Sequence, residues 1–345
     1  MENNIPAGTP EVTNENLLEV RGLQVEYRTS RGAVKAVNGL NLNISMGETL
    51  GLVGETGAGK STTAFSIMRI LPDPPAKVTG GEILYKGTDL LRLSNKEMRA
   101  VRGEEISMIF QDPMTSLDPV KTVGAQIQEM IELHEKISRK EAWKRAEDML
   151  EVVGIKRERA NDYPHQFSGG MKQRVVIAMA LSCNPKLLIA DEPTTALDVT
   201  IQAQVLELMK KLKADYRMSM IMITHDLGVV AEICDKVAVL YAGNVVEYGT
   251  MVDVFDDPRH PYTRALFDAT PTLDGEKHKL NVISGFSPDP IHLPEGCAFH
   301  PRCKETCEIC SRAMPEMVEV APGHFARCVH VGQPGKSSVE EVLAQ

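Results

Sequence analysis

Hydrophobic and polar residues alternate along the first part of the chain, with the period of two that is typical of half-buried β-strands. Valine and leucine recur at alternate positions within residues 17–45, which we predict to form strands. Short apolar runs at 49–53, 81–85 and 106–110 predict further strands. Residues 63–70, shortly after the first of these runs, predict a helix.

The pattern becomes helical in the middle of the chain. Within residues 122–154, apolar side chains recur every three or four positions among charged ones, which predicts helices. Apolar runs at 187–190 and 220–223 predict buried strands. Because strands and helices alternate over residues 187–239, we predict an α/β fold in which helices cover a parallel sheet.

The sequence changes character near residue 257, beyond which prolines and cysteines become frequent and the periodicity is weak. We therefore predict a main domain over residues 17–257 and a small extension over 258–335, with a core separate from that of the main domain. Residues 1–16 are polar, and we predict that they are disordered and are not a signal peptide. Residues 336–345 are predicted to form a loose tail.

The composition limits the classes of function. Of the 345 residues, 43% are hydrophobic and 25% are charged, as in ordinary globular proteins. The net charge of −9 argues against a general nucleic-acid surface, and no apolar run reaches the length of about 18 residues that a membrane helix needs. In a chain without a signal peptide, the seven cysteines are predicted to be metal ligands or core residues rather than disulfides.

A glycine-rich loop stands between the run at 49–53 and the predicted helix, and it matches the phosphate-loop pattern G-x-x-x-x-G-K-[ST]. Its glycines allow backbone N–H groups to surround phosphates, while Lys60 adds a charge and Ser61 offers a hydroxyl to Mg²⁺. The loop residues are Gly54, Glu55, Thr56, Gly57, Ala58, Gly59, Lys60, Ser61 and Thr62. The sequence therefore predicts binding of a nucleoside triphosphate.

Polar residues that suit hydrolysis follow three of the predicted strands. Asp191 and Glu192 end the run at 187–190, where Asp191 is suited to hold Mg²⁺ and Glu192 to polarise the attacking water. His225 could sense the γ-phosphate, and Gln111 could reach the metal or the water. Each of these residue types is also common for structural reasons, so it is the phosphate loop that favours the catalytic interpretation.

A second glycine-rich stretch, Phe167-Ser168-Gly169-Gly170-Met171-Lys172-Gln173, precedes a predicted helix that Ser168 is placed to cap. With this stretch the chain resembles the ATP-binding subunits of ABC transporters over residues 17–254. The phosphate loop resembles the Walker A motif of that family, residues 167–173 its signature loop and 188–192 its Walker B motif. The remaining matches are Gln111 (Q-loop), residues 196–198 with Asp198 (D-loop), His225 (H-loop) and Tyr27, where the family stacks an aromatic ring on adenine.

This resemblance implies a P-loop ATPase fold with a β subdomain, a parallel-sheet core and a helical subdomain. It also implies a site that exists only in a dimer, in which Ser168, Gly169 and Gly170 meet the γ-phosphate bound to the other subunit. Two molecules of ATP with Mg²⁺ would then be held between two such domains. The catalytic positions match the family pattern, so we expect hydrolysis.

Two further stretches resemble the dipeptide/oligopeptide importers within that family. Residues 109–119 look like their extended Q-loop, and 260–263 look like the opening of their C-terminal extension. The resemblance implies an ATPase at the cytoplasmic face of the membrane that powers peptide import. Its partners would be a homologous ATPase subunit in a heterodimer, two membrane permeases and an extracytoplasmic peptide-binding protein, and no nucleic acid.

Other functions remain open at this point. Within the same subfamily the substrate could be a nickel chelate, glutathione or a peptide antibiotic. A more distant alternative is a soluble ABC ATPase that acts on DNA or ribosomes. Such proteins usually carry two ATPase cassettes or a long coiled-coil insertion, and this acidic chain has one cassette and no such insertion.

The extension contains four cysteines, Cys297, Cys303, Cys310 and Cys328, that resemble the pattern which holds a [4Fe–4S] cluster in some relatives. Four thiolates suit iron–sulfur or zinc equally well. Zinc sites usually contain closer Cys pairs, which Cys307, between Cys303 and Cys310, could supply. Cys307 departs from the family pattern. A cluster, a zinc site and unligated thiols are therefore the three alternatives.

Overall fold

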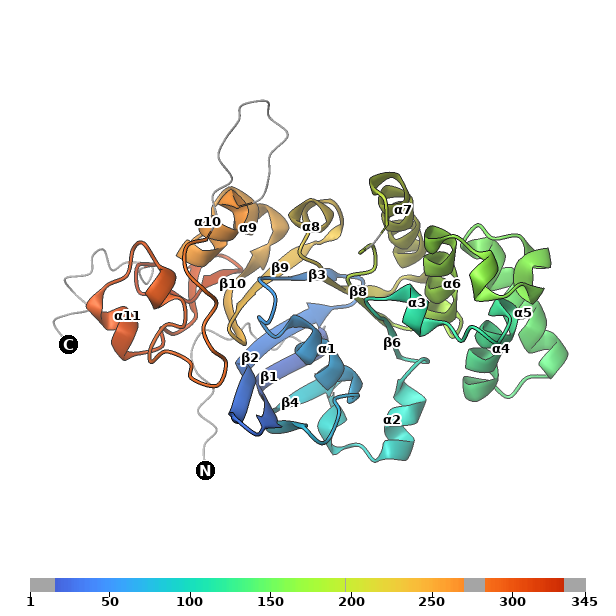
Figure 1. Cartoon of the computed structure of the whole chain (residues 1–345), viewed down its shortest axis with the longest axis horizontal. Coiled ribbons are helices and arrows are strands. Elements are labelled where there is room, and N and C mark those ends of the chain that lie inside the picture. The colour runs from blue at the N-terminus through green and yellow to red at the C-terminus, as the bar shows by residue number, and fades with distance from the viewer. Residues whose placement is uncertain (1–15, 196, 270–282, 332–345) are drawn as a thin grey trace. The chain divides into compact units, whose positions relative to one another are not determined.

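The structure is a computed structural model, and it describes residues 16–195, 197–269 and 283–331 (Figure 1). The chain divides into two compact units. The first unit is Met1–Ser45, Leu50–Leu91 and His225–Gln345, and the second is Met46–Thr49 and Arg92–Thr224. Residues 1–15 of the predicted N-terminal segment, residue 196 and the predicted tail at 336–345 lie outside the described residues.

Most of the first unit's N-terminal part is an antiparallel sheet with the strand order β2-β1-β4-β5. Its strands are β1 (Asn16–Thr29), β2 (Gly32–Ser45), β4 (Ala76–Tyr85) and β5 (Thr88–Asp89). Alternate residues of β1 and β2 are buried for much of their length, as the period of two predicts. The predicted strands over residues 17–45 are thus confirmed.

A second group of strands in the first unit adds β3 (Thr49–Val53) and β9 (Lys236–Tyr241), which pair in parallel. Strand β10 (Asn244–Thr250) then runs antiparallel to β9. Beyond it come β12 (His324–Ala326), paired with β10, and β11 (Val318–Ala321), paired with β12. The sequence did not predict β11 and β12, because runs this short carry too little periodicity.

The helices of the first unit are short. They are α1 (Lys60–Met68), α8 (Leu227–Ile233), α9 (Met251–Asp256), α10 (Pro261–Asp268) and α11 (Glu308–Arg312), with 3₁₀ turns η1 (Leu90–Arg92, at the boundary of the units) and η4 (His300–Arg302). Helix α1 starts at Lys60, so the phosphate loop leads directly into a helix N-terminus.

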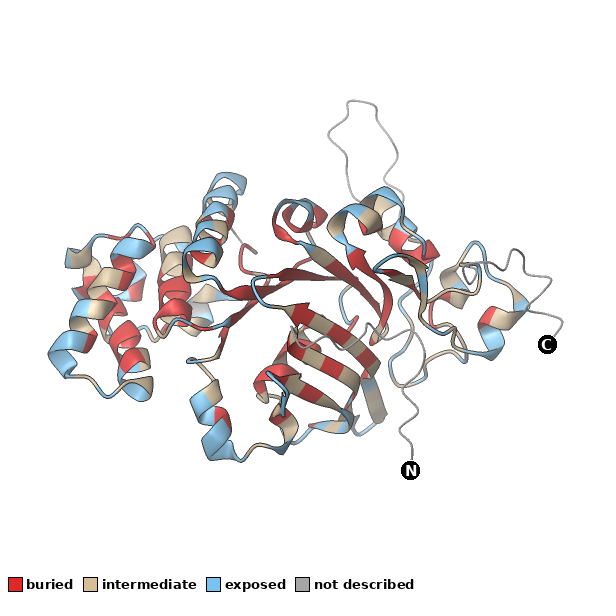
Figure 2. Cartoon of the chain, turned by 180° about the vertical axis from the view of Figure 1, so that it is seen from behind, coloured by how far each residue is buried: buried red, intermediate tan, exposed pale blue. Residues whose placement is uncertain are grey.

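The second unit contains three parallel strands in the order β6-β7-β8. They are β6 (Ile106–Ile109), β7 (Leu187–Asp191) and β8 (Ser219–Ile223), and all their residues are buried (Figure 2). Strands buried on both faces are typical of parallel sheets in α/β proteins. The predicted α/β fold is therefore confirmed.

Helices make up most of the rest of the second unit. They are α2 (Asn95–Val101), α3 (Pro113–Ser116), α4 (Val123–His134), α5 (Arg139–Val152), α6 (Gly169–Leu181) and α7 (Val199–Tyr216), with 3₁₀ turns η2 (Arg157–Asn161) and η3 (Pro164–Gln166). The predicted helical region at 122–154 forms α4 and α5. Within the described residues, no helix combines the length and apolar character needed to span a membrane.

Candidate functional site

The phosphate loop connects β3 to α1, and its first and last glycines have backbone angles that other residues avoid. Gly54 has φ 145° and Gly59 has φ 100°. A Cβ atom on Gly54 would lie 2.2 Å from the carbonyl oxygen of Leu240, and one on Gly59 would lie 2.6 Å from that of Ala36. Both contacts are too close for any side chain, so the sequence needs glycine at these two positions.

Lys60 lies in the concave loop with only 8% of its surface exposed. Its ammonium group donates hydrogen bonds to the carbonyl oxygens of Gly54 at 2.7 Å and Glu55 at 3.1 Å. Among the described residues, no side chain caps the start of α1. The first N–H groups of the helix are therefore available to an anion, and the positive end of the helix dipole adds to the attraction.

Tyr27 lies at the edge of this loop. Its hydroxyl oxygen is 3.5 Å from the Oγ1 atom of Thr62. The ring is half-buried, so part of it is open to solvent. Stacking of Tyr27 on adenine stays a prediction.

Glu55, the second residue of the loop, contacts side chains that sequence reasoning did not assign to the nucleotide site. Its carboxylate accepts hydrogen bonds from Arg302 Nη1 at 2.7 Å, Arg302 Nη2 at 3.0 Å and Ser287 Oγ at 3.0 Å. Its backbone N–H donates to the hydroxyl oxygen of Tyr262 at 2.8 Å. Burial alone would raise the pKa of Glu55, but the hydrogen bonds from Arg302 and Ser287 outweigh it, and the pKa lies below its ordinary value.

The second unit places two of the predicted catalytic residues together. The Oε2 atom of Glu192 accepts hydrogen bonds from Gln111 Nε2 at 2.8 Å and from Thr195 Oγ1 at 2.9 Å. Glu192 has φ 48°, and its N–H donates to the carbonyl oxygen of Ile223 on β8 at 2.8 Å. Two side chains thus hold one oxygen of the carboxylate just after β7. Sequence reasoning missed Thr195, which has no signal beyond its place three residues after Glu192.

The other polar residues near strand ends differ in exposure. Asp191 is the last residue of β7 and is buried. His225 follows β8 and is exposed. The carboxylate of Asp198 accepts from the N–H of Ile201 at 3.0 Å, so this residue caps α7. Metal binding by Asp191 and phosphate sensing by His225 remain predictions.

The Ser168 loop is exposed at its tip but packed at its base. Ser168 and Gly169 are both exposed, and Ser168 Oγ accepts the N–H of Met171 at 3.4 Å, which confirms the predicted cap of α6. A Cβ atom on Gly170 would lie 2.4 Å from a methyl group of Ile201 on α7. Glycine at this position therefore lets the start of α6 approach α7 closely.

The C-terminal extension does not have the separate core that we expected. Residues 283–331 belong to the same compact unit as the phosphate loop. Buried Glu247 on β10 accepts hydrogen bonds from the backbone N–H of Arg259 at 2.6 Å and of His260 at 2.8 Å, and it lies 2.8 Å from His324 Nε2 on β12. A segment this small has too little apolar surface to form a core alone, so it packs against β10.

The chain matches known families over most of its length. The family "ABC transporter" matches residues 37–195, and "Oligopeptide/dipeptide transporter, C-terminal region" matches residues 246–310. The oligopeptide transport ATP-binding protein OppD of Bacillus subtilis (strain 168) is 52% identical over 334 residues, which cover 95% of this chain and 93% of the relative. OppD of Salmonella typhimurium is 51% identical over 314 residues, 90% of this chain and 93% of the relative.

This chain is a member of the oligopeptide/dipeptide family of ABC transporter ATP-binding proteins. A dimeric structure of the ATP-binding cassette MJ0796 in a post-hydrolysis state, bound to ADP and Pi, superposes with a TM-score of 0.61 at 29% identity. It covers 68% of this chain and 98% of the cassette. The chain therefore carries an ABC ATPase domain, and the prediction of an ATPase is confirmed.

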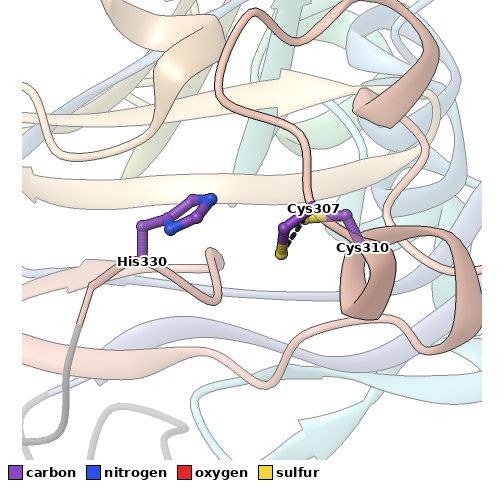
Figure 3. Close-up of side chains that lie close together, drawn as sticks. All are labelled: Cys307, Cys310 and His330. Carbon is purple, nitrogen blue, oxygen red and sulfur yellow. Dashed lines mark hydrogen bonds between the residues drawn. The ribbon is translucent and has the colours of Figure 1, made fainter. Parts of the chain in front are cut away.

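The cysteine-rich part of this family member contains a close group of metal-binding atoms. Cys307, Cys310 and His330 have side-chain donor atoms that all lie within 4.8 Å of one another, and the two sulfur atoms are 3.4 Å apart (Figure 3). In the described part of the chain this is the one such group of three or more. His330 was missed because a single histidine far along the sequence carries no motif.

The four cysteines predicted from the family pattern meet at the same place. Cys297, Cys303, Cys310 and Cys328 all line one small cavity of about 10 Å³, which His330 also lines. Burial raises the pKa of Cys328 to about 11 and raises the pKa values of the other three thiols. The cavity is roughly the size of one water molecule.

Proposed function

We propose that this chain is the ATP-hydrolysing subunit of a membrane importer for di- and oligopeptides, acting at the cytoplasmic face of the membrane. The observation that carries the proposal is the presence of two glycine-rich loops at helix N-termini, of which the phosphate loop contains a buried lysine. Lys60 is buried in the phosphate loop, whose tip at Thr56 and Gly57 is exposed, whereas Ser168 and Gly169 are exposed at the start of α6. Relatives about half identical in sequence are named for oligopeptide and dipeptide transport, which supports the substrate class.

Each unit supplies part of the chemistry in this proposal. The first unit holds the phosphates through Lys60 and the N–H groups of the loop, and Tyr27 stacks on adenine. Mg²⁺, when bound, neutralises charge on the phosphates, and the hydroxyl of Ser61 and the carboxylate of Asp191 are oxygen donors of the kind it prefers. Glu192, oriented by Gln111 and Thr195, positions the attacking water.

The Ser168 loop serves the other subunit in this proposal. Its exposed N–H groups at a helix N-terminus suit the γ-phosphate of a nucleotide bound elsewhere. We propose a homologous ATPase subunit as the partner in a heterodimer, docked on two membrane permeases that receive peptide from an extracytoplasmic binding protein. Residues such as Asp198 and His225 would act near the dimer interface.

Reconstitution in liposomes tests this function. The chain is assembled with two permeases, a homologous ATPase subunit and a peptide-binding protein from its own organism, and ATP hydrolysis is measured with and without peptide. We expect peptide to stimulate hydrolysis and to accumulate inside, and a Glu192→Gln chain to do neither. If a nickel chelate or glutathione stimulated hydrolysis and peptide did not, that compound would replace peptide as the proposed substrate. If only DNA or ribosomes stimulated hydrolysis, the proposed transport function would be rejected.

We further propose that the extension binds a metal centre. The family pattern favours a [4Fe–4S] cluster on Cys297, Cys303, Cys310 and Cys328, and such a cluster is held by four thiolates. The small cavity and the close group of Cys307, Cys310 and His330 favour a single zinc ion instead. The donor atoms suit either group, so the two candidates differ in which residues matter.

Anaerobic purification followed by metal analysis separates these candidates. A cluster predicts a brown protein with about four iron and four sulfide per chain. It would be lost in Cys297→Ser or Cys328→Ser and kept in Cys307→Ser or His330→Ala. Zinc bound by Cys307, Cys310 and His330 predicts a colourless protein. The zinc would be lost in Cys307→Ser or His330→Ala and kept in Cys297→Ser or Cys328→Ser. A chain that contains neither iron nor zinc would reject the metal centre.

A further inference from the structure

A carboxylate lies at the second position of the phosphate loop, where a negative charge should oppose ATP. Glu55 directly follows Gly54, whose carbonyl oxygen accepts from Lys60. A triphosphate bound in this loop would bring several negative charges close to that carboxylate. An unpaired charge there would weaken ATP binding by Coulomb repulsion in a partly desolvated site.

Arg302 compensates for this charge. Its guanidinium binds Glu55 through two parallel hydrogen bonds at 2.7 and 3.0 Å, and only 6% of the arginine side chain is exposed. Two-point pairing fixes the direction of the carboxylate as well as its charge. Arg302 also donates from Nε to the carbonyl oxygen of Ser284 at 3.0 Å and from Nη1 to the hydroxyl of Tyr241 at 3.3 Å. The guanidinium is therefore held in place independently of Glu55.

The backbone of Glu55 is fixed from the same side. Its N–H donates to the hydroxyl of Tyr262, a fully buried residue at the start of α10. The ring of Tyr262 packs on Phe299, with centroids 5.3 Å apart. Phe299 lies three residues before Arg302. The same short segment therefore holds the side chain of Glu55 directly, through Arg302, and the backbone of Glu55 indirectly, because Phe299 packs on Tyr262.

We propose that Arg302 is a positioning residue of the nucleotide site, which neutralises Glu55 and fixes the first turn of the phosphate loop for ATP. This inference rests on the proposed function of that loop. It makes the segment from Cys297 to Cys303 part of the ATP site, although that segment lies more than 200 residues from the loop in sequence. The residue acts through Glu55 and has no direct role in catalysis.

The test is a double-mutant cycle on the full-length chain, read out as the affinity for the fluorescent analogue mant-ATP with Mg²⁺. Arg302→Met should weaken binding about tenfold, because it leaves the Glu55 carboxylate unpaired beside the phosphates. The same substitution in a Glu55→Gln chain should weaken it less than about threefold, since no charge remains to be neutralised. The loss of mant-ATP affinity caused by Arg302→Met alone should also become smaller as salt is added.

Arg312→Met is the matched control, because Arg312 pairs with Glu308 in the same extension with both side chains 71% exposed. It should leave mant-ATP affinity unchanged. If Arg302→Met does not fold, Arg302→Lys gives the same comparison on a smaller scale, with about a threefold loss beside Glu55 and none in the Glu55→Gln chain.

The outcomes are distinct. Two results would overturn the role of Arg302 while leaving the proposed function intact. One is an equal loss of mant-ATP affinity from Arg302→Met in the wild-type and Glu55→Gln chains, and the other is wild-type affinity in Arg302→Met. Failure of the wild-type chain to bind mant-ATP at all would overturn the proposed function and this inference with it.

Discussion

The phosphate loop and the Ser168 loop are both glycine-rich turns that lead into a helix, but they differ in what surrounds them. In the phosphate loop, Lys60 is 8% exposed and binds carbonyl oxygens of its own loop, and Glu55 is held by Arg302. In the other loop, Ser168 and Gly169 are exposed. The phosphate loop thus buries its lysine and its first and last glycines and exposes its tip at Thr56 and Gly57, whereas the Ser168 loop presents the start of α6 at the surface.

In the proposed function, this difference gives the two loops separate tasks. A loop with a buried cation at a helix N-terminus can bind a nucleotide by itself. We propose that the exposed Ser168 loop contributes instead to a site that another subunit completes.

The largest effect is expected from Glu192→Gln, which alters hydrolysis and spares the phosphate loop. The amide can still occupy the place between Gln111 and Thr195 but cannot accept a proton or polarise water as a carboxylate does. We expect ATP turnover in the assembled transporter to fall by about a hundredfold or more. Binding of mant-ATP should stay within about threefold of wild type, and near-normal turnover would show that Glu192 is not the base.

Lys60→Ala changes the phosphate loop itself. It removes a buried charge from the phosphates, and a charge-assisted hydrogen bond contributes about 1.5–3 kcal/mol. We expect ATP affinity to fall roughly ten- to a hundredfold. Isothermal titration checks this, with Lys86→Ala, a surface lysine beside Tyr85, as the control. Unchanged affinity would mean that the loop does not use its lysine.

A smaller effect should come from His260, which supports Tyr262 behind the phosphate loop. His260 is buried, its Nδ1 atom accepts the N–H of Tyr262 at 3.0 Å, and burial with the nearby Arg264 and Arg327 lowers its pKa from 6.5 to about 3. A lowered pKa in the folded state gives stability that is complete above pH 6.5 and is lost as the pH falls from there towards 3.

Chemical denaturation at two pH values measures this contribution. Between about pH 7.5 and 5.5 the unfolding free energy should fall by roughly 1 kcal/mol from this residue. His260→Asn keeps a capping acceptor but cannot titrate, so its pH dependence should be weaker by that amount. Identical pH profiles for the variant and the wild type would contradict the assigned protonation state.

Sequence reasoning was most successful where a motif is contiguous. The phosphate loop, the cap of α6 by Ser168 and the separate apolar runs that form β6, β7 and β8 each depend on residues close together in the chain. Their geometry follows from local backbone needs, such as the left-handed angle of Gly59. These features could therefore be predicted from spacing alone.

The sequence was less informative where contacts join distant segments. The pair between Glu55 and Arg302 spans 247 residues, and nothing in the phosphate-loop motif or in the cysteine pattern around Arg302 indicates that the two residues meet. Strands β11 and β12 were missed, and with them the packing of the extension on β10. Such contacts depend on which surfaces the folded chain brings together, and no periodicity encodes this.

The central claim is that the Ser168 loop completes the site of another subunit, and Ser168→Arg tests it most directly. The assembled transporter is incubated with photoreactive azido-ATP and vanadate, and the label trapped on each ATPase subunit after hydrolysis is measured. The bulky arginine blocks the exposed loop and leaves Lys60 untouched. The label trapped on the partner subunit should therefore be reduced more than the label trapped on this chain. Loss of label from this chain alone, with the partner still labelled, would contradict the account.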